Sequence, residues 1–140
     1  MATTYGAEAT ITGSLEVDGD IILGTGDDKV IFKGLTYDTE SKSGPGDDGS
    51  NLNAFTPLSL LSSTGGILGV TLPDGTVDGQ SKRILITGYS SALTITVTSA
   101  SWKSGNEGTI TFSAAAEFVN LVWANSSWWP MGSPASVSYS

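Results

Sequence analysis

The 140-residue sequence predicts an all-β protein: a compact antiparallel β-sandwich, or jelly-roll-like domain, that follows an extended β arm. Three observations predict this class. Apolar residues recur at every second position in most apolar segments, as they do in strands with one buried face. Turns rich in Gly, Asp and Pro separate these short segments. No segment combines an apolar helical stripe with helix caps, so we expect little helix.

The charge distribution divides the chain into two regions. Residues 1–50 hold ten carboxylates and three lysines, a net charge of −7, whereas residues 51–140 have a net charge of only −1. We therefore predict an acidic N-terminal β arm over residues 1–38, a Gly/Ser/Asp-rich loop over 39–55 and a β-sandwich domain over 56–140.

The predicted arm contains a clear period-two pattern. Apolar or glycine residues occupy alternate positions from Ile11 to Leu23, so this segment is expected to be extended. It fits a β-hairpin that turns at Asp18-Gly19. It fits equally a strand-and-turn repeat of the β-spiral or β-helix kind, which would need neighbouring chains because two short copies cannot bury a core alone.

The predicted loop lacks the apolar residues of a buried strand. From Thr39 to Asn53 the chain is almost entirely polar, and Pro45 stands between two glycines. Such a stretch is typical of a long loop or linker.

Residues 56–140 predict short strands separated by turns. The segment from Leu58 to Leu61 fits either a strand or a helical turn. Pro73-Asp74-Gly75 is a turn signal, because proline supplies the fixed φ that a turn needs. The other predicted strands, in order, are 68–72, 83–87, 93–98, 109–112, 118–123 and 127–129.

The tryptophans suggest both a core and an interface. Trp123 lies in a fully apolar strand and is expected in the core. Trp128 and Trp129 must point to opposite faces if the chain is extended, which leaves one ring for a subunit contact or a ligand. A sugar-stacking platform of exposed rings is the alternative. The predicted interface comprises Ile11, Leu15, Val17, Ile21, Leu23, Val30, Phe32, Trp128 and Trp129.

Composition narrows the function. The chain has no cysteine and no histidine, which excludes thiol nucleophiles, Ser-His-Asp triads and the usual ligands of zinc, copper and haem. A net charge of −8 disfavours nucleic acid and anionic membranes as partners. The first residues lack the pattern of a signal peptide, so we expect no Sec export.

Carboxylate pairs are the remaining route to chemistry. Asp18/Asp20 and Asp74/Asp78 could act as in glycosidases, but both pairs flank glycine in turns, where Asp is favoured for its local hydrogen bonds. Clustered Asp residues could also hold calcium, although no EF-hand pattern is present. We therefore expect no enzyme activity and name no catalytic residue, cofactor or metal ligand.

Two stretches resemble structural proteins of tailed bacteriophages, particularly those of marine and cyanobacterial hosts. The first spans about residues 70–129 and includes LPDGTVDGQSKRILITG and ALTITVTSASWKSGNEGTITFSAAAEFVNLVWANSSWW. The second is ITGSLEVDGDIILGTGDDKVIFKG, near the N-terminus. Within that group, a chain of this size most resembles a capsid decoration, or cement, protein.

The resemblance implies a mechanical role. Decoration proteins commonly sit as trimers on the outer surface of the head shell, where they bridge capsomers. The implied partners are the major capsid protein and two further copies of this chain, and the implied location is the virion. The acidic arm would intertwine with neighbouring copies or add a strand to a capsid loop. Two alternatives stay open: a tail fibre, collar or neck appendage module, and a carbohydrate-binding β-module.

Overall fold

The computed structural model describes residues 38–102 and 106–140, and residues 36–140 form one compact unit. The described residues contain no helix, as expected for an all-β protein. The predicted arm, with its hairpin or repeat, lies outside the described residues. The strands are β1 (Thr39–Ser43), β2 (Leu58–Ser62), β3 (Leu68–Leu72), β4 (Ser81–Gly88), β5 (Leu93–Trp102), β6 (Asn106–Phe112), β7 (Phe118–Ala124), β8 (Ser127–Gly132) and β9 (Ser138–Tyr139).

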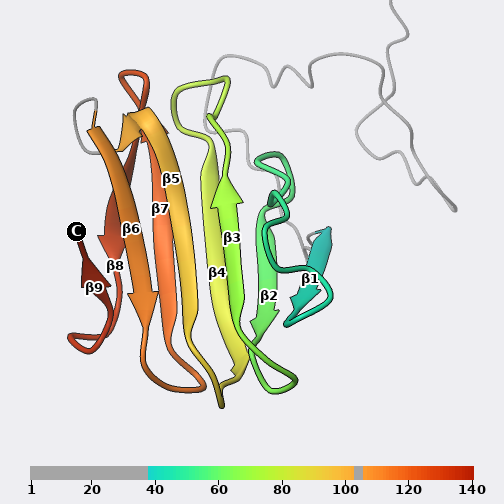
Figure 1. The fold of residues 1–140 in the computed structure, drawn as a ribbon. Helices are drawn as coiled ribbons and strands as arrows, with labels where there is room; N and C mark the ends of the chain where they lie inside the picture. The colour runs from blue at the N-terminus through green and yellow to red at the C-terminus, as the bar shows by residue number, and fades with distance from the viewer. Residues whose placement is uncertain (1–37, 103–105) are drawn as a thin grey trace, which may run out of the picture. The chain divides into compact units, whose positions relative to one another are not determined.

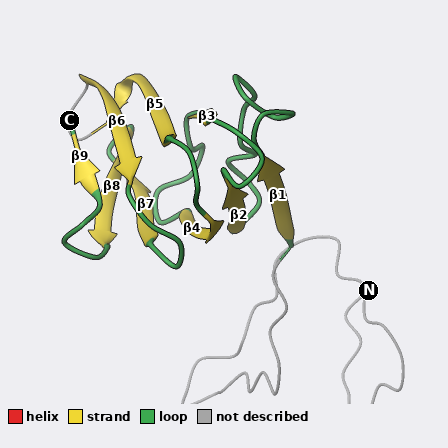
Figure 2. Ribbon diagram, turned by 60° about the horizontal axis from the view of Figure 1, so that its bottom comes forward, coloured by secondary structure: helices red, strands yellow, loops and turns green. Residues whose placement is uncertain are grey.

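The strands form two layers (Figures 1 and 2). One layer has the order β1-β2-β4-β7-β8 and is called the β4 sheet here. The other has the order β5-β6-β9, with β3 on the other side of β5, and is called the β5 sheet. The layers join where Trp102 of β5 pairs with Trp128 of β8. The arrangement is sandwich-like, as the sequence predicts.

The first half of the unit winds between the layers. Successive strands β2, β3, β4 and β5 alternate between the two sheets, so that β2 lies parallel to β4 and β3 lies parallel to β5. The offset is 25 positions in both sheets, from Leu58 to Arg83 and from Leu68 to Leu93. β1 adds a further parallel strand beside β2. This is the geometry of a short, flattened β-helix.

The second half closes the unit with antiparallel strands. β6 returns along β5, β7 pairs with β4, β8 with β7 and β9 with β6. The β7–β8 hairpin turns at Asn125 and Ser126, whose φ angles of 51° and 57° suit a two-residue hairpin turn. Pairing is therefore mixed, and the expectation of a purely antiparallel sandwich is wrong for β1 to β5. Period-two patterns fix which face is buried but not the direction of the neighbouring strand.

The segment 39–55, expected to be a loop, belongs to the sandwich. Its first five residues form β1, and Asn51 makes a parallel bridge to Thr71 of β3. Leu52 is buried, and its N–H donates to the carbonyl oxygen of Thr71 at 2.8 Å. The segment therefore forms the first winding, although few of its residues are apolar.

The core lies between the two sheets. It is built from alternate residues of β3, β4, β5, β6 and β7, which is the pattern that predicted strands in this region. Leu58–Ser62 is a strand, which settles the ambiguity of that segment. The Trp123 and Trp128 rings pack edge to face at a centroid distance of 5.3 Å near the junction of the layers.

Candidate interaction surface

The outer side of the β4 sheet is unusually apolar. Leu60 of β2 pairs in register with Leu85 of β4, which pairs with Phe118 of β7. The neighbouring residues Leu61, Ile84 and Val119 are buried between the sheets, so this row projects away from the core. An uninterrupted apolar row across three adjacent strands is uncommon on a solvated sheet face, where polar residues normally alternate with the buried ones.

Further apolar side chains extend this row along the sheet. Phe118 and Met131 are 40% and 70% exposed, and Met131 follows Pro130 at the bulge between β7 and β8. Val122 and Trp129 face each other in register, and each is half-buried. We define the outer apolar face as Leu58, Leu60, Leu85, Phe118, Val122, Trp129 and Met131.

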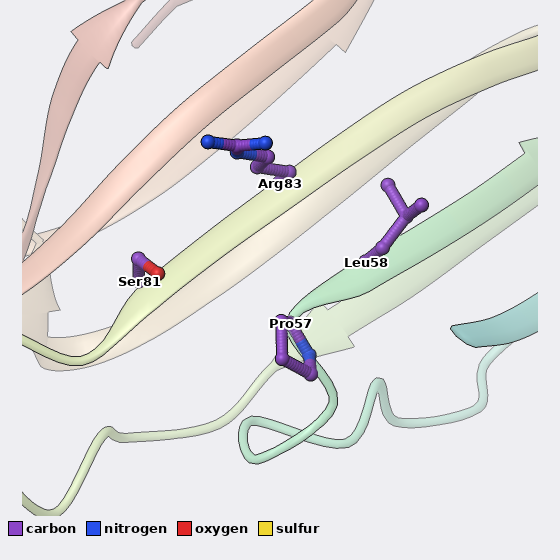
Figure 3. Close-up of a pocket in the computed structure, with 4 residues that line it drawn as sticks. All are labelled: Pro57, Leu58, Ser81 and Arg83. Atoms are coloured by element: carbon purple, nitrogen blue, oxygen red, sulfur yellow. The ribbon is translucent and has the colours of Figure 1, made fainter. Parts of the chain in front are cut away.

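A shallow hollow lies on this face where β2 begins beside β4. Pro57, Leu58, Ser81 and Arg83 line it, and Figure 3 shows Leu58 and Arg83 projecting from the neighbouring strands β2 and β4. Arg83 pairs in register with Leu58 of β2 on one side and with Asn120 of β7 on the other. The strands of the face contribute no carboxylate to this side, which is notable in a chain of net charge −8.

The other outer surface has a different chemistry. On the β5 sheet, Thr71, Thr96 and Thr109 stand in register across three strands. A second row places Thr94 beside Thr111, which faces Ser138. Threonine combines high strand propensity with a hydroxyl group that water can solvate. This surface is therefore suited to remain in solvent.

A buried ion pair connects β4 to the first winding, residues 39–55, on the inner side of the β4 sheet. Lys82 points inward from β4 and is fully buried, and its Nζ donates to Glu40 Oε1 at 2.7 Å. It also donates to the carbonyl oxygens of Asn53 and Thr56 at 2.8 and 2.7 Å. Glu40 in turn accepts hydrogen bonds from Ser59 Oγ and from the N–H of Asn53. Three protons and three acceptors thus satisfy the ammonium group despite its burial.

The ionisation of this pair follows from its partners. Burial raises the pKa of the Glu40 carboxyl, but hydrogen bonds from Lys82, Ser59 and Asn53 outweigh burial, and the net pKa lies below its ordinary value of 4.5. Burial also lowers the pKa of Lys82, although Glu40 opposes this. The lowered pKa of Glu40 favours its charged form, whereas the lowered pKa of Lys82 favours its neutral form. We take both groups as charged at neutral pH because each is surrounded by short hydrogen bonds to its charged form.

Glu117 is a second buried carboxylate with a local role. It is 4% exposed, accepts hydrogen bonds from the N–H and Oγ of Ser113 at 2.7 and 2.8 Å, and is also bonded by Ser136 and the backbone of Ala114. Burial raises the pKa of Glu117, but these hydrogen bonds bring it below 4.5 overall. Glu117 therefore stabilises the turn between β6 and β7.

The predicted interface tryptophans fall in different places. Trp128 is fully buried and donates from Nε1 to the carbonyl oxygen of Pro73 at 2.9 Å, so its assignment to an interface is wrong. Its indole N–H needs an acceptor, and the loop before β4 supplies one inside the unit. Trp129 lies on the outer apolar face, which leaves it half-buried. The other predicted interface residues, Ile11, Leu15, Val17, Ile21, Leu23, Val30 and Phe32, lie outside the described residues.

Three of the described aspartates accept backbone hydrogen bonds in loops and turns. Asp78 Oδ1 accepts the Asn125 N–H at 3.1 Å, and Asp48 Oδ1 accepts the Gly69 N–H at 2.7 Å. Asp47 accepts the Ser43 N–H and lies 3.6 Å from Lys42. Within residues 38–102 and 106–140, no three acidic residues gather to hold a metal ion. Asp18, Asp20, Asp27 and Asp28 lie outside the described residues.

Sequence reasoning did not single out most of the outer apolar face. The sequence places Leu85, Phe118 and Val122 in strands, and Leu58 and Leu60 in either a strand or a helical turn, without a role of their own. The available signal was the continuity of the apolar runs LSLL, RILI and FVNLVW, which place apolar residues on both sides of a strand. Such runs indicate strands covered on both faces.

The chain matches no family model and no curated protein. In the part of the chain that the structure describes, no helix is long and apolar enough to cross a membrane.

Proposed function

We propose that this chain is a non-enzymatic structural protein of a tailed-bacteriophage virion, a trimeric decoration protein that binds the outside of the head shell and stabilises it. The observation that carries the proposal is the outer apolar face, a set of half-buried and exposed apolar side chains on the outer side of the β4 sheet. Apolar side chains gathered on the outer side of a sheet are typical of a protein-interaction site. The resemblance of residues 70–129 to phage structural proteins supplies the kind of partner.

The proposed partners are the major capsid protein and two further copies of the chain. Many weak contacts repeated over a shell add up through multivalency, so no single contact has to be strong. The acidic arm, residues 1–38, would add contacts to neighbouring copies or to a capsid loop with a complementary basic patch. The extended arm and the jelly-roll-like topology stay predictions.

The test is the stoichiometry of the chain in purified particles from a culture that carries the sequence. Quantitative mass spectrometry against the major capsid protein should find the chain in a fixed ratio to capsid subunits. Recombinant chain added to undecorated heads should also raise their resistance to heat. A few copies per particle would indicate a tail fibre, collar or neck module, and absence from particles would refute the proposal.

The carbohydrate-binding alternative has its own readout. Trp123 and Trp128 are in the core, so Trp129 is the half-buried ring left to meet a ligand among the three tryptophans whose side chains are described. Sugar-dependent quenching of tryptophan fluorescence would favour a carbohydrate-binding module. The proposed decoration protein should show no such quenching.

A further inference from the structure

We propose that two linked turns at one end of the sandwich insert Phe55 and Val77 into an apolar pocket of the major capsid protein, so that the chain docks on the shell through this end. The proposal deepens the proposed function, on which the identity of the partner rests, because it names the surface that meets the shell. Phe55 and Val77 are 69% and 65% exposed, and neither belongs to the outer apolar face.

The two turns lie at the same end of the strands. Phe55 lies in the turn before β2, and Val77 lies in the turn before β4. β2 and β4 are adjacent and parallel, so both turns are found where these strands start, at the upper end in Figure 1. Turn residues are normally polar. One end of the sandwich therefore presents two large apolar side chains where polar ones are expected.

Hydrogen bonds hold the turn that carries Phe55. The Thr56 N–H donates to the carbonyl oxygen of Asn53 at 3.2 Å, and the Phe55 N–H donates to Asn53 Oδ1 at 2.9 Å. From inside the sandwich, the buried Lys82 Nζ donates to the carbonyl oxygens of Asn53 and Thr56 at 2.8 and 2.7 Å. Phe55 is therefore exposed on a turn whose backbone is fixed by a buried ammonium group.

The turn that carries Val77 is held as well. The Gln80 N–H donates to the carbonyl oxygen of Val77 at 3.0 Å, which closes a four-residue turn. Gly79 has a φ of 91°, which suits the third position of a type II turn. The backbone that follows Val77 is thus fixed by its own turn.

One side-chain amide links the two turns. Gln80 Nε2 donates at 2.6 Å to the carbonyl oxygen of Ala54, the residue before Phe55. Gln80 Oε1 accepts at 2.9 Å from the N–H of Thr76, the residue before Val77. Single apolar residues on a surface are ordinary, but here two are presented on turns that are tied together. Such preorganised groups lose less conformational entropy when a partner binds.

The charge of the two loops indicates the chemistry of the pocket. Residues 53–57 and 73–80 contain Asp74 and Asp78 and no lysine or arginine. Asp78 is exposed and accepts a hydrogen bond from the uncharged backbone N–H of Asn125, a contact that leaves its negative charge in place. A complementary partner therefore has an apolar pocket for the two side chains and a basic group at the rim of this pocket.

Docking through the turns gives the two proposed kinds of partner different surfaces. The outer apolar face runs along the strands of the β4 sheet, whereas the turns lie at the ends of these strands. A chain that stands on the shell through its turns directs the outer apolar face sideways, toward neighbouring copies. The shell and the other copies of the trimer are then contacted by different parts of the sandwich.

The experiment measures the binding of the full recombinant chain to heads assembled without it, by co-sedimentation over a range of chain concentrations. Phe55→Ser should raise the dissociation constant about tenfold or more, and Val77→Ser about threefold or more, because each removes an apolar anchor. Ile67→Ser is the matched control and should bind as wild type does. Ile67 is 61% exposed and lies between the end of β2 and the start of β3, at the opposite end of the strands.

Gln80→Ala tests the link between the turns. It keeps both apolar side chains and removes the amide that ties their turns together, so it should raise the dissociation constant about threefold. An unchanged dissociation constant would overturn the claim that the turns are preorganised for the shell. Every variant should keep the circular dichroism spectrum of wild type, and Val77→Ser carries the test if Phe55→Ser fails to fold.

Hydroxyl-radical labelling identifies what covers Phe55. Labelling should be high in the free chain and should fall when the chain is bound to heads. Equal protection in the free chain would show that the chain itself covers Phe55, and would overturn the proposal.

Failure of this contact differs from failure of the proposed function. A wild-type chain that binds heads as tightly as both Ser variants do would refute the contact alone. A wild-type chain that does not bind heads and is absent from particles would refute the decoration function and the contact with it.

Discussion

The two outer faces of the sandwich share one strand geometry and differ in chemistry. On the β4 sheet, Leu60, Leu85 and Phe118 form a row across three strands. On the β5 sheet the corresponding row is Thr71, Thr96 and Thr109. Both rows point away from the core, so neither the apolar row nor the threonine row is required for strand pairing or for filling the core. The difference teaches that the outer composition of a sheet is independent of its strand geometry, and the proposed contact rests on the apolar composition of one face.

The inner sides of the sheets differ as well. The β5 sheet contributes apolar residues such as Leu93, Ile95 and Val97 to the core. The β4 sheet contributes Ile84 and Ile86, but its inward series also includes the charged Lys82. The sheet with the apolar outer face thus depends on a buried polar contact to hold its edge strand, whereas the threonine-covered sheet does not have such a contact among its described residues.

The largest effect on stability should come from breaking that polar contact. Lys82→Ala leaves Glu40 half-buried without its cation and removes the donor to the carbonyl oxygens of Asn53 and Thr56. We expect a loss of about 3–5 kcal/mol in the free energy of unfolding, measured by urea denaturation. The matched control is Lys42→Ala, because Lys42 pairs with Asp47 at 3.6 Å in a more exposed setting. That change should cost at most about 1 kcal/mol. Equal losses would show that Lys82 has no special role.

The junction of the two sheets should be the next most sensitive place. Gly75 lies against the Trp123 ring, and an added Cβ would overlap the ring atoms. Gly75→Ala should therefore cost about 1–3 kcal/mol through displacement of Trp123 and its neighbour Trp128. Gly46→Ala is the control, because an added Cβ there meets its nearest atom at 3.8 Å. Thermal unfolding of both variants checks this, and a wild-type melting temperature for Gly75→Ala would contradict the packing described.

The sequence predicts most of the second half of the unit and less of the first. The alternating patterns around Leu93 and Ile110 identify their strands correctly, because burial of one face imposes period two. β1 escaped prediction because its inward residues, Glu40 and Lys42, are charged, and the partner of Glu40, Lys82, lies 42 positions away. The parallel winding escaped prediction because periodicity does not encode the direction of the neighbouring strand. Trp129 is the residue of the outer apolar face that sequence reasoning had proposed as an interface.

Acid should weaken the first winding and the β6–β7 turn. The pKa values of Glu40 and Glu117 are lower in the folded chain than their ordinary value of 4.5. Such groups stabilise the fold above the unfolded pKa, and this contribution is lost as the pH falls through the folded pKa. The free energy of unfolding should therefore decrease as the pH drops below about 4.5.

A substitution of Glu117 measures how much this carboxylate contributes to the pH dependence of stability. Glu117→Gln should lower stability at neutral pH and make the acid dependence shallower, as followed by urea midpoints across this range. The same pH dependence in wild type and variant would exclude Glu117 as a contributor.

The smallest effect should come from the threonine-covered face. Thr111 is exposed, so Thr111→Lys should change the free energy of unfolding by no more than about 0.5 kcal/mol and leave the mass in solution unchanged. Leu85→Lys places the same charge in the middle row of the outer apolar face and should weaken association. If both lysine variants behaved alike in light scattering, the contrast between the faces would have no functional meaning.

The most direct test of the account is hydroxyl-radical footprinting of the wild-type chain at low and high concentration, with mass spectrometry of each peptide. Labelling of Met131 and Phe118 should fall as the concentration rises, while labelling of Ile67, which is 61% exposed outside the face, should stay constant. Undiminished labelling of Met131 and Phe118 in an assembled sample would show that copies meet elsewhere and would contradict the central claim.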